Sequence, residues 1–127
     1  MNGKNAEGYL DPTAATAIKN VSDFGFRPLV YICSPYSGDV AENTEKARRY
    51  SRFAVDKGAI PIAPHLLLPQ YMHEETERDL AMFMDMVILS KCAELWVFGS
   101  RISAGMQAEI DRAKRKNIPV RYFTEDL

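Results

Sequence analysis

The sequence predicts an α/β domain in which a small parallel sheet carries helices on both faces. The chain has 127 residues, of which 46% are hydrophobic and 26% charged, and this composition and length suit one globular core but not two. From Pro28 onward, short apolar runs rich in β-branched and aromatic residues alternate with longer amphipathic segments. Such alternation favours right-handed crossovers between parallel strands.

The elements of the domain follow from this pattern. Residues 29–33 (Leu-Val-Tyr-Ile-Cys) are a buried-strand run, and Pro61 makes the second strand an edge strand. Asn117 and Pro119 end the last helix. A break is expected near Asp85 in the helix before the third strand. We expect strands at residues 29–33, 59–62, 95–98 and 119–123, and helices at 41–57, 74–92 and 103–116. Loops are expected at 34–38 and 64–73.

This order predicts a three-layer flavodoxin-like, or Rossmann-like, fold with a sheet of four to five strands over residues 28–127. Residues 1–27 are polar and interrupted by glycines and prolines, so we expect a flexible N-terminal arm. In such sheets, ligands bind beyond the carboxyl ends of the strands, where the strand order reverses. The loops that follow the first three strands should therefore share one rim.

Composition and motifs exclude several classes of protein. The net charge of −1 gives no reason to expect a nucleic-acid or membrane partner. No signal peptide is apparent, and the apolar run Leu80–Leu89 is too short to span a bilayer, so we expect a cytoplasmic protein. Cys33 and Cys92 are expected as reduced core thiols. Neither a metal site nor a cofactor is expected, because zinc spacing, a P-loop and G-x-G-x-x-G are all missing.

The strongest functional signal is the segment 94–109, which predicts a strand, a turn starting at Gly99 and a helix. Gly105 precedes Glu109 by one helical turn, and helical side chains lean toward the N-terminus, so the space above the Glu109 carboxylate should be open. Ser103 has the position of an N-cap and could also line a site. The alternative is that Glu109 is a surface residue of an amphipathic helix.

Asp85 is the single polar residue between Leu80 and Leu89. A carboxylate in an apolar stripe is costly unless it is paired or protonated, and desolvation would raise its pKa, which suits a general acid. The alternative is that Asp85 caps a helix after a break or lies at a solvent-facing edge. The residues alone leave both readings open.

The loops on the rim hold further candidates for ligand contacts. Tyr31 lies within the first strand, where a tyrosine is usually a core residue with a bonded hydroxyl, and His65 could equally be structural. A Ser-His-Asp triad is not supported, because no nucleophile elbow is present. The rim residues that we expect to contact a ligand are Ser34, Tyr36, Ser37, Gly38, His65, Gly99, Ser103 and Gly105.

The ordered spacing of these residues resembles the nucleoside 2-deoxyribosyltransferase superfamily. The resemblance extends over residues 29–123. The chain is similar both to the transferases and to the small deoxynucleoside 5′-monophosphate N-glycosidases. It is carried by Tyr31-Ile-Cys-Ser-Pro-Tyr36, Pro64-His65, Asp85, Ser103 and Gly105-x-x-x-Glu109.

The resemblance implies a role for each matching position. Glu109 matches the nucleophile that attacks C1′ of the sugar, and Asp85 matches the acid that assists the leaving base. Tyr31 matches the tyrosine that orients the nucleophile or sugar, and Ser103 falls where the sugar or phosphate is held. The resemblance also implies a small nucleoside or nucleotide as partner, and a homodimer or higher homo-oligomer.

The chain departs from the family pattern in the loop after the first strand. The monophosphate branch has an arginine there, whereas residues 34–39 contain none. Ser37 or backbone N–H groups could still bind a phosphate. Two alternatives remain. One is a non-catalytic nucleotide-binding or sensing module; the other is a phosphoribohydrolase of the lysine-decarboxylase-like type, whose usual Pro-Gly-Gly is missing.

Overall fold

The computed structural model describes residues 25–127, so the predicted arm falls almost entirely outside the described residues. Near the start of the described residues, Nη1 of Arg27 donates to the carbonyls of Val55 and Ala59. The elements in chain order are β1 (Leu29–Cys33), α2 (Val40–Asp56), β2 (Ile60–Ile62), the 3₁₀ turns η2 (Pro64–Leu66) and η3 (Leu68–Gln70), α3 (Arg78–Ser90), β3 (Glu94–Phe98), α4 (Ala104–Arg115) and β4 (Val120–Phe123).

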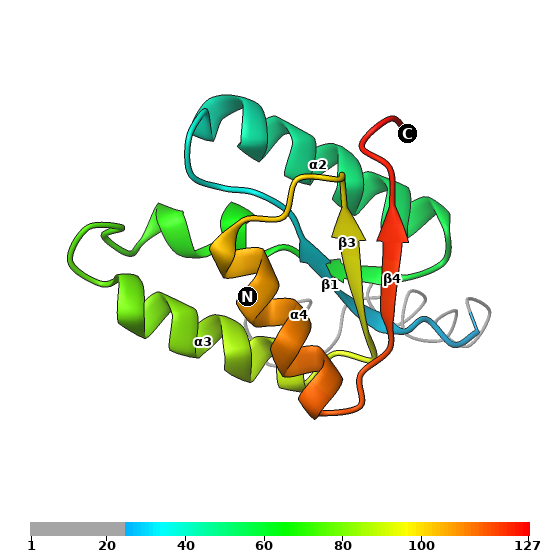
Figure 1. Cartoon of the computed structure of the whole chain (residues 1–127). Helices are drawn as coiled ribbons and strands as arrows, with labels where there is room; N and C mark the ends of the chain where they lie inside the picture. The colour runs from blue at the N-terminus through cyan, green and yellow to red at the C-terminus, as the bar shows by residue number, and fades with distance from the viewer. Residues whose placement is uncertain (1–24) are drawn as a thin grey trace, which may run out of the picture.

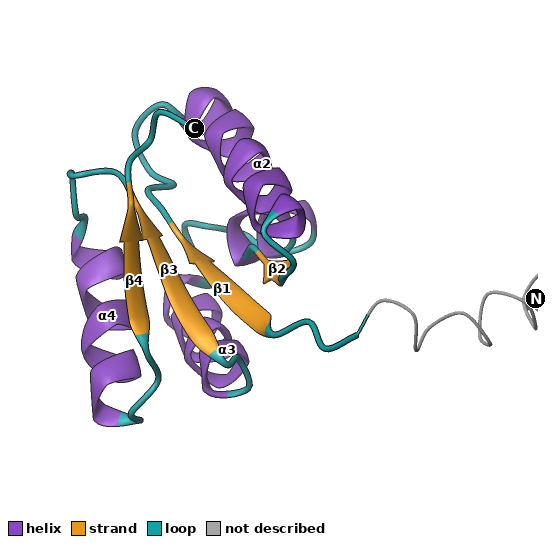
Figure 2. Ribbon diagram, turned by 90° about the vertical axis from the view of Figure 1, so that its right-hand side faces the viewer, coloured by secondary structure: helices purple, strands orange, loops and turns teal. Residues whose placement is uncertain are grey.

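The four strands form one parallel sheet in the order β2-β1-β3-β4. Helix α2 covers one face, whereas α3 and α4 lie side by side on the other, so the domain has three layers (Figure 2). This confirms the predicted three-layer fold with its small parallel sheet. The edge position of β2 agrees with Pro61, because proline cannot complete a ladder on both sides of a strand.

Each face of the sheet has its own apolar core. On the α2 face, the Tyr50 and Phe98 rings stack at 4.3 Å between centroids, with Phe53, Trp96 and Phe123 packed around them. The other core joins β1 and β3 to α3 and α4, with apolar residues at successive inward positions. Its buried members are Tyr31, Cys33, Leu89, Cys92, Leu95, Val97, Met106, Ile110 and Ala113. Alternate residues of β1 and β3 thus serve opposite cores, as the two-residue period of a strand requires.

The predicted helix 74–92 is wrong at two points. Helix α3 begins at Arg78, because the preceding residues form a turn in which the Glu77 side chain accepts from the N–H of His73 at 2.8 Å. The helix also continues without a break through Asp85, which is buried on its inner side. The expected loop 64–73 contains the turns η2 and η3, each with a proline in its first turn.

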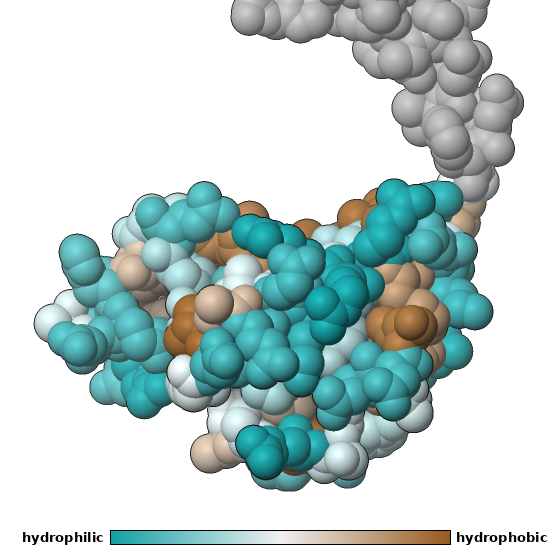
Figure 3. Space-filling model, turned by 90° about the horizontal axis from the view of Figure 1, so that it is seen from above, coloured by the Kyte–Doolittle hydropathy of each residue, from teal (hydrophilic) through white to brown (hydrophobic). Residues whose placement is uncertain are grey.

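Seen from above, the domain surface is mostly hydrophilic, with small and separated apolar areas (Figure 3). Within residues 25–127, no helix has both the length and the apolar character needed to cross a bilayer.

Candidate active site

A cavity of about 340 Å³ lies at the carboxyl end of the sheet. It is bounded by the loop after β1, the turns η2 and η3, one side of α3 and the start of α4. Figure 1 shows how these backbone segments are arranged. Its size is in the range of small-molecule sites. The change in strand order falls between β1 and β3, so the cavity occupies the position at which open α/β sheets bind ligands.

Glu109 lies at the inner end of this cavity, on the buried side of α4. The Ser103 side chain begins that helix as an N-cap, accepting from the N–H of Met106 at 3.2 Å. Met106, Glu109, Ile110 and Ala113 then fall on the face that packs against the sheet. Only 3% of Glu109 is exposed. The reading of Glu109 as a surface residue is therefore wrong.

The hydroxyl of Tyr31 donates a hydrogen bond of 2.6 Å to Oε2 of Glu109. The strand β1 thus fixes the orientation of a carboxylate carried by α4. The Cys33 thiol, two residues further along the same side of β1, donates to the Met106 carbonyl at 3.9 Å. Because Oε2 receives the hydroxyl proton, the Tyr31 bond favours the ionised form of Glu109.

Burial nevertheless raises the pKa of Glu109 to about 7. Desolvation is the main cause, and the nearby charge of Asp85 adds to it, whereas hydrogen bonding by Tyr31 and Cys33 offsets part of the rise. The pKa of the Tyr31 hydroxyl is raised well above 10 by burial and by the Glu109 charge. Tyr31 therefore remains a proton donor throughout the physiological range.

Asp85 projects into the same cavity from the middle of α3. It is 7% exposed, and its Oδ1 has no hydrogen-bond partner among the described residues. Burial, followed by the charge of Glu74, raises its pKa to about 6. A buried carboxyl oxygen without a partner is costly, so this atom is suited to a ligand that completes its hydrogen bonding. Asp85 is neither a helix cap nor a solvent-facing residue.

The charge of Asp85 contributes to the raised pKa of Glu109, but it is a smaller cause than burial. With pKa values raised to about 7 for Glu109 and about 6 for Asp85, both carboxyls titrate close to neutral pH. The Tyr31 bond stabilises negative charge on Glu109, and none of residues 25–127 donates a hydrogen bond to Oδ1 of Asp85. One ionised and one protonated carboxyl can thus coexist in a single small cavity.

An aromatic pair forms the wall opposite these carboxyl-bearing helices. The Tyr36 and His65 rings stack with centroids 5.0 Å apart and an interplanar angle of 29°. His65 Nε2 lies 3.0 Å from the Ser34 carbonyl, and burial lowers the His65 pKa, so the neutral ring carries its proton on Nε2. Asn43 of α2 holds the loop by donating to the carbonyls of Tyr36 and Ser37 at 3.0 Å.

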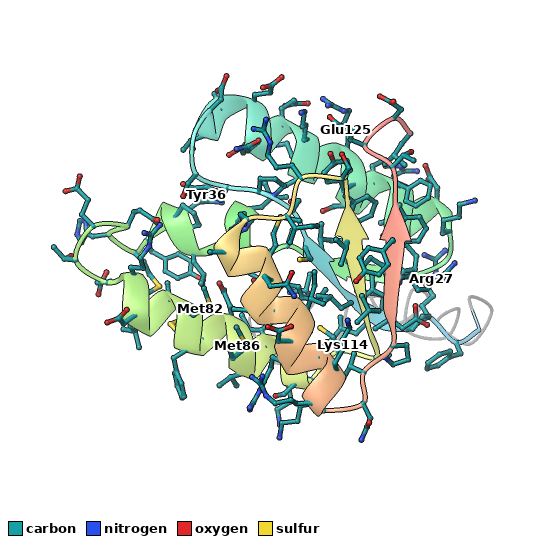
Figure 4. The ribbon with its side chains drawn as sticks, in the orientation of Figure 1. Arg27, Tyr36, Met82, Met86, Lys114 and Glu125 are labelled. Atoms are coloured by element: carbon teal, nitrogen blue, oxygen red, sulfur yellow. The ribbon has the colours of Figure 1, made fainter. Side chains whose placement is uncertain are left out.

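The space above Glu109 is narrower than we expected from the missing side chain of Gly105. A Cβ placed on Gly105 would lie 3.7 Å from the terminal methyl of Met82. Met82 and Met86 lie on the side of α3 that faces α4 (Figure 4). Gly105 therefore leaves room beside Glu109, but the Met82 methyl borders that room.

The predicted site residues do not all line the cavity. Tyr31 lies behind Glu109, and Ser34 is buried beside His65 with its Oγ unpartnered among the described residues. Gly38 and Gly99 do not line the cavity, and both adopt a positive φ in turns. A Cβ on Gly99 would point toward the Glu125 carboxylate, 3.9 Å away. The predicted residues that line the cavity are Tyr36, Ser37, His65, Asp85, Ser103, Gly105 and Glu109.

Sequence reasoning missed most of the α3 contribution to the cavity. Arg78 and Met82 lie seven and three residues before Asp85, a helical spacing that puts all three on one side of α3. That spacing was a usable signal. The Arg78 guanidinium pairs with Glu74 at 3.0 Å, also at the cavity wall.

No group of three or more metal-ligating side chains is found within the described range, residues 25–127. The cavity is lined by polar side chains of several kinds, namely Tyr36, Ser37, His65, His73, Glu74, Arg78, Asp85, Ser103 and Glu109.

Fold and cavity together define an α/β domain that presents paired carboxyls at the carboxyl ends of its strands. Residues 28–123 match the family described as domain of unknown function DUF7768. The chain belongs to that family.

The fold is similar to that of a 2-deoxyribosyltransferase from the psychrotolerant bacterium Bacillus psychrosaccharolyticus, described as a biocatalyst for the synthesis of antiviral and antitumoral nucleosides. The TM-score is 0.59 at 17% sequence identity, and the match covers 76% of this chain and 72% of the other. At this identity the likeness extends to the fold. Among curated proteins, no match is found.

Proposed function

We propose that this protein cleaves or transfers the N-glycosidic bond of a nucleoside or deoxynucleoside, or of its monophosphate. The observation that carries the proposal is that one cavity holds a buried Glu109, bonded by Tyr31, together with Asp85, whose Oδ1 has no partner among the described residues. The similarity of the fold to a 2-deoxyribosyltransferase supports the same chemistry.

In the proposed reaction, Glu109 attacks C1′ of the sugar as the C1′–N bond breaks. The ionised carboxylate stabilises the positive charge on the ring and forms a glycosyl ester. Asp85 gives its proton to the departing base, so that the base leaves neutral. Water or a second base then attacks C1′, returns its proton to Asp85 and releases the Glu109 carboxylate, as in retaining glycosidases.

The remaining walls of the cavity suit a nucleoside. The stacked rings of Tyr36 and His65 offer a flat apolar surface for a base, and such stacking is favourable for any base. Ser103 and the N–H groups at the start of α4 can bind sugar hydroxyls or a phosphate. Arg78 is a cationic side chain at the same wall that can approach an anionic substituent.

The test incubates the full chain with a panel of deoxynucleosides, ribonucleosides and their monophosphates, with and without a second free base. Chromatography is expected to detect free base alone, or a new nucleoside when the second base is present. Glu109→Gln should lose at least about 100-fold in turnover, the scale of removing a nucleophile.

The matched control is Glu45→Gln, which removes an exposed glutamate of α2 that does not line the cavity, and it should retain normal turnover. Intact-protein mass spectrometry should detect one added glycosyl group on the wild type and none on Glu109→Gln. Near-normal turnover in Glu109→Gln would remove Glu109 from the mechanism.

A second candidate is a nucleotide-binding module without catalysis. It is favoured by one observation, namely that burial raises the pKa of Glu109 to about 7, so that a large share of this carboxyl is protonated and not nucleophilic at neutral pH. Nucleotide binding measured by calorimetry, without base release and unchanged in Glu109→Gln, would support this candidate instead.

A further inference from the structure

The walls of the cavity carry more acidic than basic side chains. Glu74, Asp85 and Glu109 line it, whereas Arg78 is the single lysine or arginine that does so among the described residues. The Arg78 guanidinium lies 3.0 Å from the Glu74 carboxylate, so these two charges offset each other. Within residues 25–127, neither Asp85 nor Glu109 takes part in an ion pair. The inner part of the cavity therefore holds an excess of negative charge when its carboxyls are ionised.

Asp85 adds a second, independent sign of a ligand at this place. It is 7% exposed, it lines the cavity, and its Oδ1 has no hydrogen-bond partner in the part of the chain that the structure describes. Buried polar atoms are normally paired, so a ligand group is expected to complete this one. Since the pKa of Asp85 is raised to about 6, the group is largely ionised above neutral pH, and it then attracts a positively charged group.

The aromatic wall of the cavity supplies what a flat cation requires. The rings of Tyr36 and His65 both line the cavity and stack with centroids 5.0 Å apart. The face of an aromatic ring carries negative partial charge, so it attracts cations as well as stacking on other flat rings. Burial lowers the pKa of His65, so its ring adds no positive charge to this wall at neutral pH. One cavity thus combines an aromatic surface with carboxyls that lack an ion pair.

We propose that the cavity takes nucleosides whose base carries a fixed positive charge, such as a pyridinium or an N-alkylated purine. The inference rests on the proposed function and narrows its substrate class. The flat cationic ring stacks on Tyr36 and His65, while the carboxyls of Asp85 and Glu109 provide negative charge that a neutral base would not use.

A cationic base changes the proton balance of the proposed reaction. As the C1′–N bond breaks, its electron pair stays on the ring nitrogen, so the base leaves neutral without receiving a proton. Glu109 forms the glycosyl ester as before. Ionised Asp85 then accepts a proton from the attacking water and passes it to solvent. Hydrolysis of such a substrate therefore releases a proton in each turnover, and Asp85 acts in binding and as a base.

The charged and neutral forms of one nucleoside test the proposal directly. Nicotinamide riboside has a pyridinium ring, and its dihydropyridine form is nearly the same size but neutral. Calorimetry on Glu109→Gln, in which cleavage is blocked, should give at least about 10-fold tighter binding of the pyridinium form. The wild-type chain should release nicotinamide from that form, with acidification of a weakly buffered solution. Equal affinities, or no binding of the pyridinium form to either protein, would overturn the proposal.

Two further variants locate the charge selectivity. Asp85→Asn, combined with Glu109→Gln, should reduce the preference for the pyridinium form to below about 3-fold, because the unpartnered oxygen no longer carries charge. The matched control is Glu75→Gln, which removes an exposed glutamate that follows Glu74 but does not line the cavity. It should keep the full preference. A preference that survives Asp85→Asn, or that falls as much in Glu75→Gln, would assign it to the general surface charge and overturn the proposal.

The results separate this inference from the proposed function. If neutral nucleosides release their bases while the two forms of nicotinamide riboside bind equally, the glycosidic function stands and the charge selectivity falls. If the pyridinium form binds preferentially but the wild-type chain releases no nicotinamide, the cation site stands and the glycosidic chemistry falls.

Discussion

Tyr31 and Glu109 stand 78 residues apart in the chain and are joined by a buried hydrogen bond of 2.6 Å. The bond connects the first strand of the sheet to the helix that follows its third strand. Burial drives the Glu109 carboxyl toward its neutral form, and the Tyr31 hydroxyl opposes that tendency. Tyr31 thereby controls how much of Glu109 is ionised at neutral pH.

The first prediction follows from this contact. In Tyr31→Phe the pKa of Glu109 should rise further, because the variant removes a hydrogen bond that favours the ionised form. We expect turnover at pH 7 to fall by roughly 10- to 100-fold and the acidic limb of the pH–rate profile to move to higher pH. A profile that falls in height without moving along the pH axis would assign Tyr31 a purely structural role.

The second prediction concerns Asp85 as a proton donor. Asp85→Asn keeps the shape of the side chain but cannot give up a proton to the departing base. Substrates whose bases leave poorly should therefore lose more turnover than substrates with activated leaving groups, measured as kcat for each. An equal loss for both kinds of substrate would contradict proton donation by Asp85.

The third prediction is a dependence of stability on pH. The folded-state pKa of Glu109, about 7, is above its value in the unfolded chain, so the folded state binds more protons between roughly pH 4 and pH 7. Stability from this group is therefore present at low pH and declines as pH rises through that window. Between pH 5 and pH 8, wild type should lose about 2 kcal/mol more unfolding free energy than Glu109→Gln.

Chemical denaturation at the two pH values measures this difference directly. The comparison between the two proteins removes contributions from groups that do not interact with Glu109, including His65. An identical pH dependence in both would mean that Glu109 titrates normally in the folded protein.

The fourth prediction uses the space beside Glu109. A Cβ on Gly105 meets only the Met82 methyl at 3.7 Å, an ordinary contact, so Gly105→Ala should fold normally. Gly105→Leu fills the cavity and should weaken ligand binding or raise KM at least about 10-fold, because room for the ligand is lost. Unchanged binding in Gly105→Leu would place the ligand elsewhere.

Much of the fold could be predicted because the signals were local. Apolar runs at 29–33 and 95–98, with the glycines, prolines and caps around them, located β1, β3 and α4 to within one or two residues. Pro61 correctly placed β2 at an edge. The start of α3 was missed because Glu77 uses its side chain on the preceding turn, a contact that no residue period reveals.

The site was harder to predict than the fold. Burial of Glu109 and Asp85 depends on packing between α4, α3 and β1, which lie far apart in the sequence. The wall contributed by Arg78 and Met82 could have been found from their spacing to Asp85. By contrast, the stacking of Tyr36 on His65 depends on how two separate loops fold against each other.

The single helix α3 has 13 residues and serves three environments at once. Arg78, Ala81, Met82 and Asp85 line the cavity, and Leu89 packs in the core. Phe83, Met86, Val87 and Ser90 line a second hollow of about 480 Å³ between α3 and α4. Since each residue turns an α-helix by about 100°, inserting or deleting one amino acid near Leu80 would rotate every later side chain into the wrong environment. This segment should therefore tolerate substitutions far better than changes in length.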